Sequence, residues 1–482
     1  MKLDINDIED KMETKTIHQS LEEIFEEQRR AFLKYGPPTL GTRKITLSRL
    51  EEEILLYKNE IAQAISSDFG HRSYHETLMT EIFVCIKSIH HTKKHLKRWM
   101  KPRRQPVPWY CRPGKAKIHY QPLGVVGIMS PWNYPFQLCI GPMIAALAAG
   151  NRVMLKPSGR MPETVSIIEK IITKVFEHNE VAVVSGHGVN DAFIQLPFNH
   201  LLYTGSTQVG KKVMRAASDN LTPVTLELGG CSPVIVAEDF PVQKAVYSIL
   251  TGKLFNAGQT CISANHAFVH HSQKDRFIEI AVKAIKKMYP TALDNADFTN
   301  IVSKERYDNL RHLIEDAKSK GAKIIQPHEK ELLQSNKRKI LPTIITDTTP
   351  DMKIMKEEIF GPILPVVSYT SIYDIIEIIE QNQRPLALYC FTYNQETIDK
   401  ILRSTISGGA CINDTLLHFI QDDLPFGGVG HSGMGRYHGI YGFETFSNTK
   451  GVFYQSRLNI MGVLRPPYGK VFKTIMDFFI GK

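Results

Sequence analysis

The sequence lacks the cysteine patterns of disulfide-stabilised domains and of zinc sites. Its seven cysteines are an odd number, are scattered along the chain and include no C-x-x-C pair. Histidine doublets occur at residues 90–91 and 270–271, but no H-E-x-x-H motif accompanies them. We therefore expect reduced thiols, a cytoplasmic protein and no metal site.

Long apolar segments are also missing. No run approaches the roughly 18 apolar residues that a membrane-spanning helix needs. The N-terminus is acidic and polar and has no apolar signal core. The last residues, "VFKTIMDFFIGK" (471–482), form a short basic amphipathic stretch. We expect no transmembrane segment. The last stretch could contact a membrane or a partner subunit, and we favour a packed tail over a membrane contact.

The composition is ordinary for a globular protein, but the charge is not balanced. The 482 residues are 43% hydrophobic and 22% charged, and they carry a formal net charge of +10. A basic excess suits nucleic acid, acidic membrane surfaces or anionic small molecules. Because Lys and Arg are spread along the chain and no RNA- or DNA-binding motif is found, we interpret the excess as solubility and expect no nucleic-acid partner.

Apolar periodicity divides the chain into three parts. Residues 15–100 have apolar positions at helical spacing. From Leu123, short apolar runs alternate with helical segments, a pattern typical of a parallel sheet with crossover helices. A second alternating set covers residues 232–414. The length and this alternation predict an α/β fold with two or three domains.

Two glycine patterns invite a nucleotide-binding interpretation. "GVGHSG" (428–433) matches G-x-G-x-x-G but follows "DDLPFG" rather than a strand, so we regard it as spurious. "GSTQVGKK" (205–212) lies between a predicted strand and helix, but Lys212 occupies the position where a P-loop needs Ser or Thr. Residues 206–210 therefore either contact a pyrophosphate without hydrolysing it or form only a glycine turn and helix cap.

Four polar residues interrupt apolar settings. Asn133 follows one predicted strand, and Lys156 ends the next one. Glu227 closes a third strand, and Glu358 stands in "EEIFGP". Each alone has an ordinary explanation as a turn cap, a surface lysine or an ion-paired glutamate. Because the carboxyl ends of parallel strands share one sheet edge, we expect Asn133 and Lys156 to face one crevice, and a carboxylate at Glu227 must be either paired or used.

Cys261, in "FNAGQTCIS", is either a buried hydrophobe or a presented nucleophile. Free cysteine is among the most buried residue types, which favours the first interpretation. Of the seven cysteines, however, it alone is set among Asn256, Gly258, Gln259 and Thr260, where the backbone can approach a ligand and donate hydrogen bonds.

Seven segments in order resemble the aldehyde dehydrogenase superfamily: "PWNYP", "LKPS", "YTGSTQVG", "LELGG", "FNAGQTC", "EEIFGP" and "PFGGVGHSGMG". The resemblance extends from about residue 40 to residue 450. The short N-terminal region is similar to the class 3 and fatty aldehyde dehydrogenase branch, and "DFGHRS", "HLKRWMKPRR" and "LTPVTLELGG" are most similar to bacterial coniferyl aldehyde dehydrogenases. The chain departs from many relatives at Cys231, where a Lys is usual, and at Gly159.

The resemblance implies a catalytic cysteine. Cys261 would add to an aldehyde carbon, and Asn133 and the backbone N–H of Cys261 would stabilise the oxyanion. Hydride transfer to a nicotinamide would leave a thioester, and Glu227 would activate the water that hydrolyses it. The cofactor-binding residues implied in this way are Trp132, Lys156, Ser158, Gly205, Ser206, Thr207, Gln208, Val209, Gly210, Leu228, Glu358 and Phe360.

Cofactor choice depends on the turn after Lys156. Relatives often have Glu after "KPS", whereas here Gly159 and Arg160 follow. Without a carboxylate to repel a 2′-phosphate, we expect both NAD and NADP to be accepted. The alternative is that Gly159 only shapes the turn and Arg160 points into solvent.

The resemblance also implies an architecture and a homodimer. The expected cofactor domain is Rossmann-like and consists of residues 1–102 and 123–227. Residues 228–411 are expected to form an α/β catalytic domain. Residues 103–122 and 412–450 would form a β oligomerisation arm, and residues 451–482 a C-terminal tail. An exposed arm needs a partner, which is why we expect a dimer.

The expected substrate is a small-molecule aldehyde, of aromatic coniferyl type or, alternatively, a medium- or long-chain aliphatic one. Substrate-facing side chains are expected around Tyr134, Leu417, His418 and Phe419. Two other functions remain as alternatives: a nucleotide triphosphatase that uses residues 205–212, and a catalytically silent binding protein.

Overall fold

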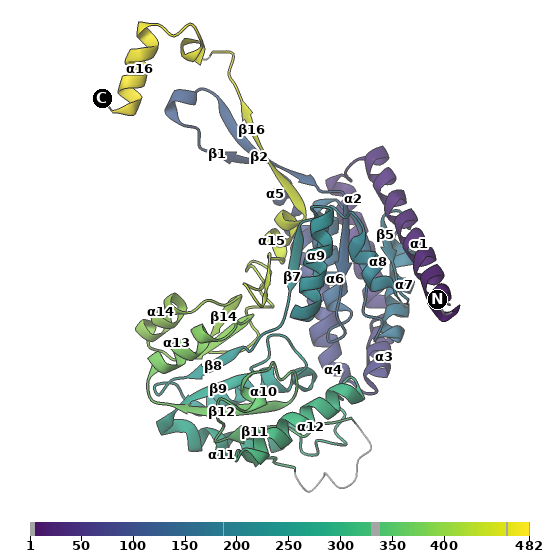
Figure 1. Cartoon of the computed structure of the whole chain (residues 1–482), viewed down its shortest axis with the longest axis vertical. Coiled ribbons are helices and arrows are strands. Elements are labelled where there is room, and N and C mark those ends of the chain that lie inside the picture. The colour runs from purple at the N-terminus through teal and green to yellow at the C-terminus, as the bar shows by residue number, and fades with distance from the viewer. Residues whose placement is uncertain (1–4, 187, 329–337, 459–460, 482) are drawn as a thin grey trace.

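The computed structural model describes residues 5–186, 188–328, 338–458 and 461–481. These residues form two α/β units, each built on its own sheet, and a thin three-stranded sheet that projects from them (Figure 1). The predicted α/β class is confirmed.

Residues 5–99 are mostly helical, which confirms the prediction for residues 15–100. Their elements are α1 (Ile5–Tyr35), α2 (Leu40–Leu56), α3 (Lys58–Phe69), α4 (Tyr74–Thr77), the π-helical turn η1 (Leu78–Phe83) and α5 (Val84–Trp99). The buried side chains of α2, α3 and α5 belong to the same apolar core as the sheet that follows.

The first α/β unit contains a six-stranded sheet. Its strands, in spatial order, are β15 (Gly433–Met434), β7 (Val224–Glu227), β6 (His200–Thr204), β3 (Val125–Met129), β4 (Arg152–Lys156) and β5 (Val181–Val183). All neighbours are parallel except β15, which runs antiparallel to β7. The connecting helices are α6 (Gln137–Ala149), α7 (Pro162–Val175), α8 (Val189–Gln195) and α9 (Thr207–Asp219).

Burial explains the sequence pattern of this unit. Every residue of β3 is buried, as expected for a parallel strand with both faces covered. The Val and Ile side chains of α7 are buried as well. Helix α9 begins at Thr207, where the Ser206 hydroxyl caps it by accepting from the backbone N–H of Val209 at 3.4 Å.

The second unit contains a seven-stranded sheet. Its strands, in spatial order, are β10 (Lys323–Ile325), β11 (Thr343–Thr346), β12 (Ile363–Tyr369), β9 (His266–His270), β8 (Pro233–Val236), β13 (Ala387–Phe391) and β14 (Gly409–Ile412). Only β10 is antiparallel to its neighbour. Its helices are α10 (Val242–Leu254), α11 (Lys274–Met288), α12 (Lys304–Ser319), α13 (Ile372–Gln381) and α14 (Gln395–Ser404).

The projecting sheet joins distant parts of the chain. It consists of β1 (Arg103–Gln105), β2 (Lys115–Pro122) and β16 (Ser447–Tyr454), all antiparallel. Helix α15 (Gly439–Thr445) precedes β16, and α16 (Lys470–Ile480) lies at the far end of the molecule (Figure 1). The segment 412–450 therefore contributes β15 to the first sheet as well as β16 to the projecting one.

Within the described residues, no helix is both long enough and apolar enough to cross a bilayer. Nor do the described His, Cys, Asp and Glu side chains form a cluster suited to a metal ion. The seven cysteines are free.

Candidate active site

Cys261 lies in the turn between the short helix η3 (Phe255–Gly258) and β9. The path of this turn depends on glycine, because Gly258 has φ +74° and a Cβ there would collide with the backbone carbonyl of Gly361. Asn256 has φ +51°, and a hydrogen bond from its backbone N–H to Glu76 Oε2, at 2.9 Å, holds it in place. The thiol therefore stands on a turn whose backbone is fixed from two sides.

Cys261 lines two cavities at once. A junction cavity of about 210 Å³ also contacts Asn133, Glu227 and Glu358. On the other side, an apolar cavity of about 570 Å³ extends past Tyr134. Cys261 therefore forms part of the wall between them.

The junction cavity continues into a third space, the wide cleft, of about 1200 Å³. The two share Pro131, Trp132, Thr204, Gly205 and Ser206 in their linings. The wide cleft, the junction cavity and the apolar cavity therefore border one another in turn, and Cys261 lies between the last two.

Asn133 lies in the loop after β3 and is buried. Its side-chain Nδ2 donates to the backbone carbonyl of Gln259 at 3.2 Å, and its own carbonyl accepts from Asn256 Nδ2 at 2.9 Å. These bonds connect the loop to the turn of Cys261. Because an amide has two N–H groups, the second remains available to an oxygen in the junction cavity.

Glu227 ends β7 at the wall of the junction cavity, where β15 pairs with it through Gly433. It is 3% exposed, and neither carboxylate oxygen has a hydrogen-bond partner. Burial raises the pKa of this carboxyl well above its ordinary value, which nearby Arg436 offsets in part. A buried carboxyl without partners is costly to a fold and is typical of a general base.

The Cys261 thiol is protonated at neutral pH in the free protein. Burial, followed by the charges of Glu358 and Glu227, raises its pKa to about 12. The backbone N–H groups of Cys261 and Ile262 act in the opposite direction. Reaction as a thiolate therefore requires a group that takes the proton.

Glu358 faces Cys261 from the loop before β12. Burial raises its pKa to about 7, while the backbone N–H of Gly230, which donates to Oε1 at 3.1 Å, lowers it. A Cβ at Gly229 would collide with this carboxylate, which explains the glycine at that position. Buried Lys253 also lies near, and burial lowers its pKa to about 7.

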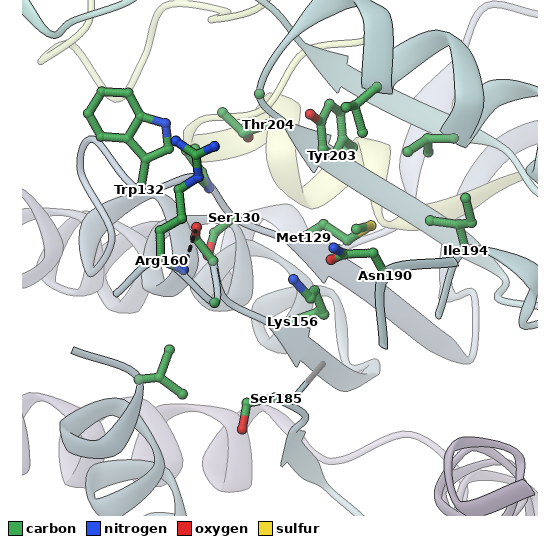
Figure 2. A pocket seen from close by; sticks show the side chains of 18 of the residues that line it. Met129, Ser130, Trp132, Lys156, Arg160, Ser185, Asn190, Ile194, Tyr203 and Thr204 are labelled. Carbon is green, nitrogen blue, oxygen red and sulfur yellow. Dashed lines mark hydrogen bonds between the residues drawn. The ribbon is translucent and has the colours of Figure 1, made fainter. Parts of the chain in front are cut away.

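The wide cleft lies at the carboxyl ends of β3, β4 and β6 (Figure 2). Lys156 ends β4 and is 7% exposed, and burial lowers its pKa. Ser206 lies at the N-terminus of α9, where free backbone N–H groups favour an anion. The Thr204 hydroxyl is buried without a partner. Cationic, N–H and hydroxyl donors on a cleft of this size suit a phosphorylated dinucleotide.

Comparison with known proteins gives a consistent result. The family model described as "Aldehyde dehydrogenase family" matches residues 13–452. The chain belongs to the aldehyde dehydrogenase family. It is therefore an NAD(P)-dependent oxidoreductase that acts on aldehydes.

Three relatives of this aldehyde dehydrogenase illustrate the similarity. A "Probable coniferyl aldehyde dehydrogenase" of Pseudomonas aeruginosa is 44% identical over 95% of this chain and 96% of that protein. An "Aldehyde dehydrogenase, dimeric NADP-preferring" of Rattus norvegicus is 37% identical over 91% of this chain and 96% of that protein. A solved structure of AldH from Staphylococcus aureus in a substrate-bound state is 39% identical and has a TM-score of 0.90. The match covers 95% of this chain and 99% of that one.

The aldehyde dehydrogenase structure brings most of the predicted site residues together. Those that line the wide cleft or the junction cavity are Cys261, Glu227, Asn133, Trp132, Lys156, Ser158, Gly205, Ser206, Val209, Leu228, Glu358 and Phe360. Thr207, Gln208 and Gly210 line neither. Thr207 donates from its hydroxyl to the His431 carbonyl at 3.3 Å, and Gly210 gives the Leu228 side chain room to pack.

The substrate-facing residues are partly as expected. Tyr134, Leu417 and Phe419 line the apolar cavity. His418 does not, because its ring is buried against Tyr389 at a centroid distance of 5.8 Å. Neighbours in an irregular segment point in different directions, which apolar patterning cannot distinguish.

Sequence reasoning missed the ion pair that supports Asn133. Arg72 and Glu81 are fully buried and lie 2.7 Å apart. Arg72 donates to the Asn133 carbonyl at 3.1 Å, while Glu81 accepts from the backbone N–H groups of Phe136 and Gln137 at 3.1 and 2.7 Å. In the sequence both residues look like ordinary charges in a helical region, so no local signal marks them.

Proposed function

We propose that this aldehyde dehydrogenase oxidises an aromatic, coniferyl-type aldehyde to its carboxylic acid through a covalent adduct at Cys261. The observation that carries the proposal is that Cys261 lines both the junction cavity and the apolar cavity. An aldehyde in the apolar cavity and a cofactor that reaches from the wide cleft would therefore meet at this sulfur.

In the acylation half, Cys261 gives its proton to Glu227, which passes it to solvent, and the sulfur bonds to the aldehyde carbon. The carbonyl oxygen becomes an oxyanion, for which Asn133 Nδ2 and the Cys261 backbone N–H are the donors. Bound NAD(P) supplies the acceptor for the hydride that leaves this carbon. The carbonyl re-forms as a thioester on Cys261.

In the deacylation half, Glu227 takes a proton from water, and the resulting hydroxide bonds to the thioester carbon. The carbon–sulfur bond then breaks, the carboxylic acid is released, and the proton held by Glu227 returns to the sulfur, which restores Cys261. The lack of hydrogen-bond partners on both Glu227 oxygens supports this role, because the carboxylate is free to accept from water.

The lining of the apolar cavity supports an aromatic substrate. Tyr134, Phe255 and Phe419 supply ring faces on which a planar substrate can pack. Ser248 and Asp414 add polar groups for ring substituents. The coniferyl aldehyde dehydrogenase name of the P. aeruginosa relative points in the same direction.

A medium- or long-chain aliphatic aldehyde is the second candidate, because an apolar cavity of about 570 Å³ also suits an alkyl chain. Comparison of kcat/KM for cinnamyl-type aldehydes and for saturated aldehydes of increasing length distinguishes the two. A higher kcat/KM for the saturated series would contradict the aromatic assignment.

For the cofactor and the assembly, we infer that NAD and NADP are both accepted by a cytoplasmic homodimer. Gly159 and Arg160 line the wide cleft, and the carboxylates in its lining, Glu169 and Asp191, come from other segments. The name of the rat relative includes both "dimeric" and "NADP-preferring".

The covalent step is tested with Cys261→Ala, for which we expect no aldehyde oxidation but unchanged cofactor binding. Cys111→Ala, in the projecting sheet, is the matched control and should remain active. Appreciable turnover by Cys261→Ala would overturn the mechanism.

A further inference from the structure

Two arginines from different parts of the fold stand where the wide cleft meets the junction cavity. Arg160, in the turn between β4 and α7, lines the wide cleft. Arg306, in the first turn of α12, lines the junction cavity. The first belongs to the unit of the six-stranded sheet and the second to the unit of the seven-stranded sheet. Neither takes part in the steps derived from Cys261 and Glu227.

The two guanidinium groups lie close enough to repel each other. Arg160 Nη2 is 3.6 Å from Glu305 Oε2, and Glu305 directly precedes Arg306. Burial lowers the pKa of Arg306, the carboxylates of Glu358 and Glu305 raise it, and the charge of Arg160 lowers it. Like charges in a partly buried site oppose each other, and an anion between them removes the repulsion.

Both side chains retain donors for a ligand. The Arg306 guanidinium lies over the Phe360 ring, 5.8 Å from its centroid, and donates to the Ile359 carbonyl at 3.3 Å. This is its one side-chain hydrogen bond among the described residues, although a guanidinium has five N–H groups. Arg160 and Glu305 are 54% and 78% exposed, so their ion pair is weak and easily exchanged for a stronger one.

The wall that the two spaces share is suited to a negatively charged group. Ser206 lies at the N-terminus of α9, which offers backbone N–H groups. Thr204 is 8% exposed, and its hydroxyl has no hydrogen-bond partner within the described part of the chain. Both residues line the wide cleft and the junction cavity. A dinucleotide that extends from one space into the other has its diphosphate at its midpoint, and therefore at this wall.

Arg160 extends toward the same wall. In Figure 2 its side chain points to Trp132 and away from Ser185. Trp132 lines both spaces, whereas Ser185 lines only the wide cleft. The guanidinium is therefore directed toward the junction cavity, from which Arg306 approaches.

We propose that Arg160 and Arg306 clamp the diphosphate of the bound cofactor, one from each α/β unit. A guanidinium matches two phosphate oxygens at once through parallel N–H groups, which makes arginine well suited to this ligand. The diphosphate would replace Glu305 as the partner of Arg160 and would lie between the two like charges. The proposal rests on the proposed position of the cofactor, across the wide cleft and the junction cavity.

The test is equilibrium titration calorimetry of the full-length protein with NADH, NADPH, ADP and adenosine. ADP has the diphosphate but no nicotinamide ribose, and adenosine has no phosphate. Arg160→Gln and Arg306→Gln should each raise the Kd of NADH, NADPH and ADP about tenfold or more, and should leave the Kd of adenosine unchanged. Arg160→Lys and Arg306→Lys should recover part of the loss, because the charge remains without the planar fork.

The matched control is Arg311→Gln, which removes an exposed arginine from the same helix as Arg306. Arg311 lines neither the wide cleft nor the junction cavity. This variant should bind all four probes like the wild type. Thermal melts without ligand check that every variant is folded.

Three results would overturn the proposal. An unchanged Kd of ADP in both Gln variants would show that neither arginine contacts the diphosphate. A loss of NADH affinity in Arg306→Gln with no loss for ADP would assign Arg306 to Glu358 and the nicotinamide ribose. A loss confined to NADPH in Arg160→Gln would assign this side chain to the 2′-phosphate.

A failure of the proposed function gives a different result from all three. It would appear in the wild type, as aldehyde oxidation that does not depend on Cys261. A failure of the clamp alone would leave that oxidation dependent on Cys261 and would change only the Kd values of the arginine variants.

Discussion

Asn133 donates from its side-chain amide to the carbonyl of Gln259, two residues before Cys261. Arg72 holds the carbonyl of the same Asn133 from the other side. One N–H of the amide is thereby used to fix the direction of the other. The proposed oxyanion donor is therefore positioned before substrate arrives, which is the condition under which such donors lower a barrier most.

Replacement of Asn133 by Ala should lower kcat by about 10²–10³-fold, because one donor to the oxyanion is lost. Cofactor affinity, measured by fluorescence titration, should change little. A kcat close to that of the wild type would show that the Cys261 backbone N–H is sufficient.

Glu227→Gln should slow thioester hydrolysis more than hydride transfer. A burst of reduced cofactor followed by a slow steady state is expected, with the acyl-enzyme visible by mass spectrometry. In the wild type, burial raises the pKa of Glu227, so the rate constant of deacylation should increase with pH, with an apparent pKa well above the ordinary value of a glutamate. If Glu227→Gln shows the same pH dependence, the titration belongs to another group.

The Glu227 carboxyl should also lower the free energy of unfolding as the pH rises. Its folded-state pKa is raised, so the folded protein binds the proton more tightly than the unfolded chain does, and this contribution is lost as the pH increases through the folded-state pKa. Glu227→Gln should therefore be more stable than the wild type at pH 8, by about 1 kcal/mol or more, with the difference shrinking toward pH 5. Thermal melts across this range measure it, and a constant difference would contradict the assignment.

Arg72→Met should destabilise the protein by about 3–5 kcal/mol, because the carboxylate of Glu81 would remain buried without its partner. Arg72→Met/Glu81→Met should recover part of this loss in chemical denaturation. It should not recover kcat, because the bond to the Asn133 carbonyl is still missing. Full recovery of kcat would mean that Arg72 contributes only to stability.

Cofactor choice is tested at Gly159, where a Cβ has no neighbour within 4 Å. Wild-type kcat/KM values for NAD and NADP should lie within roughly tenfold, or about 1.4 kcal/mol. Gly159→Glu should reduce the use of NADP selectively by repelling the 2′-phosphate, whereas Gly159→Gln, of equal size without charge, should not. Roughly thousandfold discrimination for NAD in the wild type would contradict the inference.

The sequence was sufficient where a residue's role follows from its place on a regular element. Lys156 and Glu227 were located from apolar strand patterns that end in a charge, and the fold class followed from alternation. Arg72, Glu81 and His418 were not located, because their directions depend on packing between segments far apart in the chain.

The pairing of β15 and β16 also affects how the chain folds during synthesis. Strand β7, which carries Glu227, gains its outer neighbour only when Gly433 and Met434 have emerged, and β2 gains β16 later still. Until then both strands present open edges, which are the features of a nascent chain that attract other strands. A chain whose synthesis is interrupted before β16 is made would therefore have unpaired strand edges and a tendency to aggregate. Protection by chaperones should matter most while this stretch is synthesised.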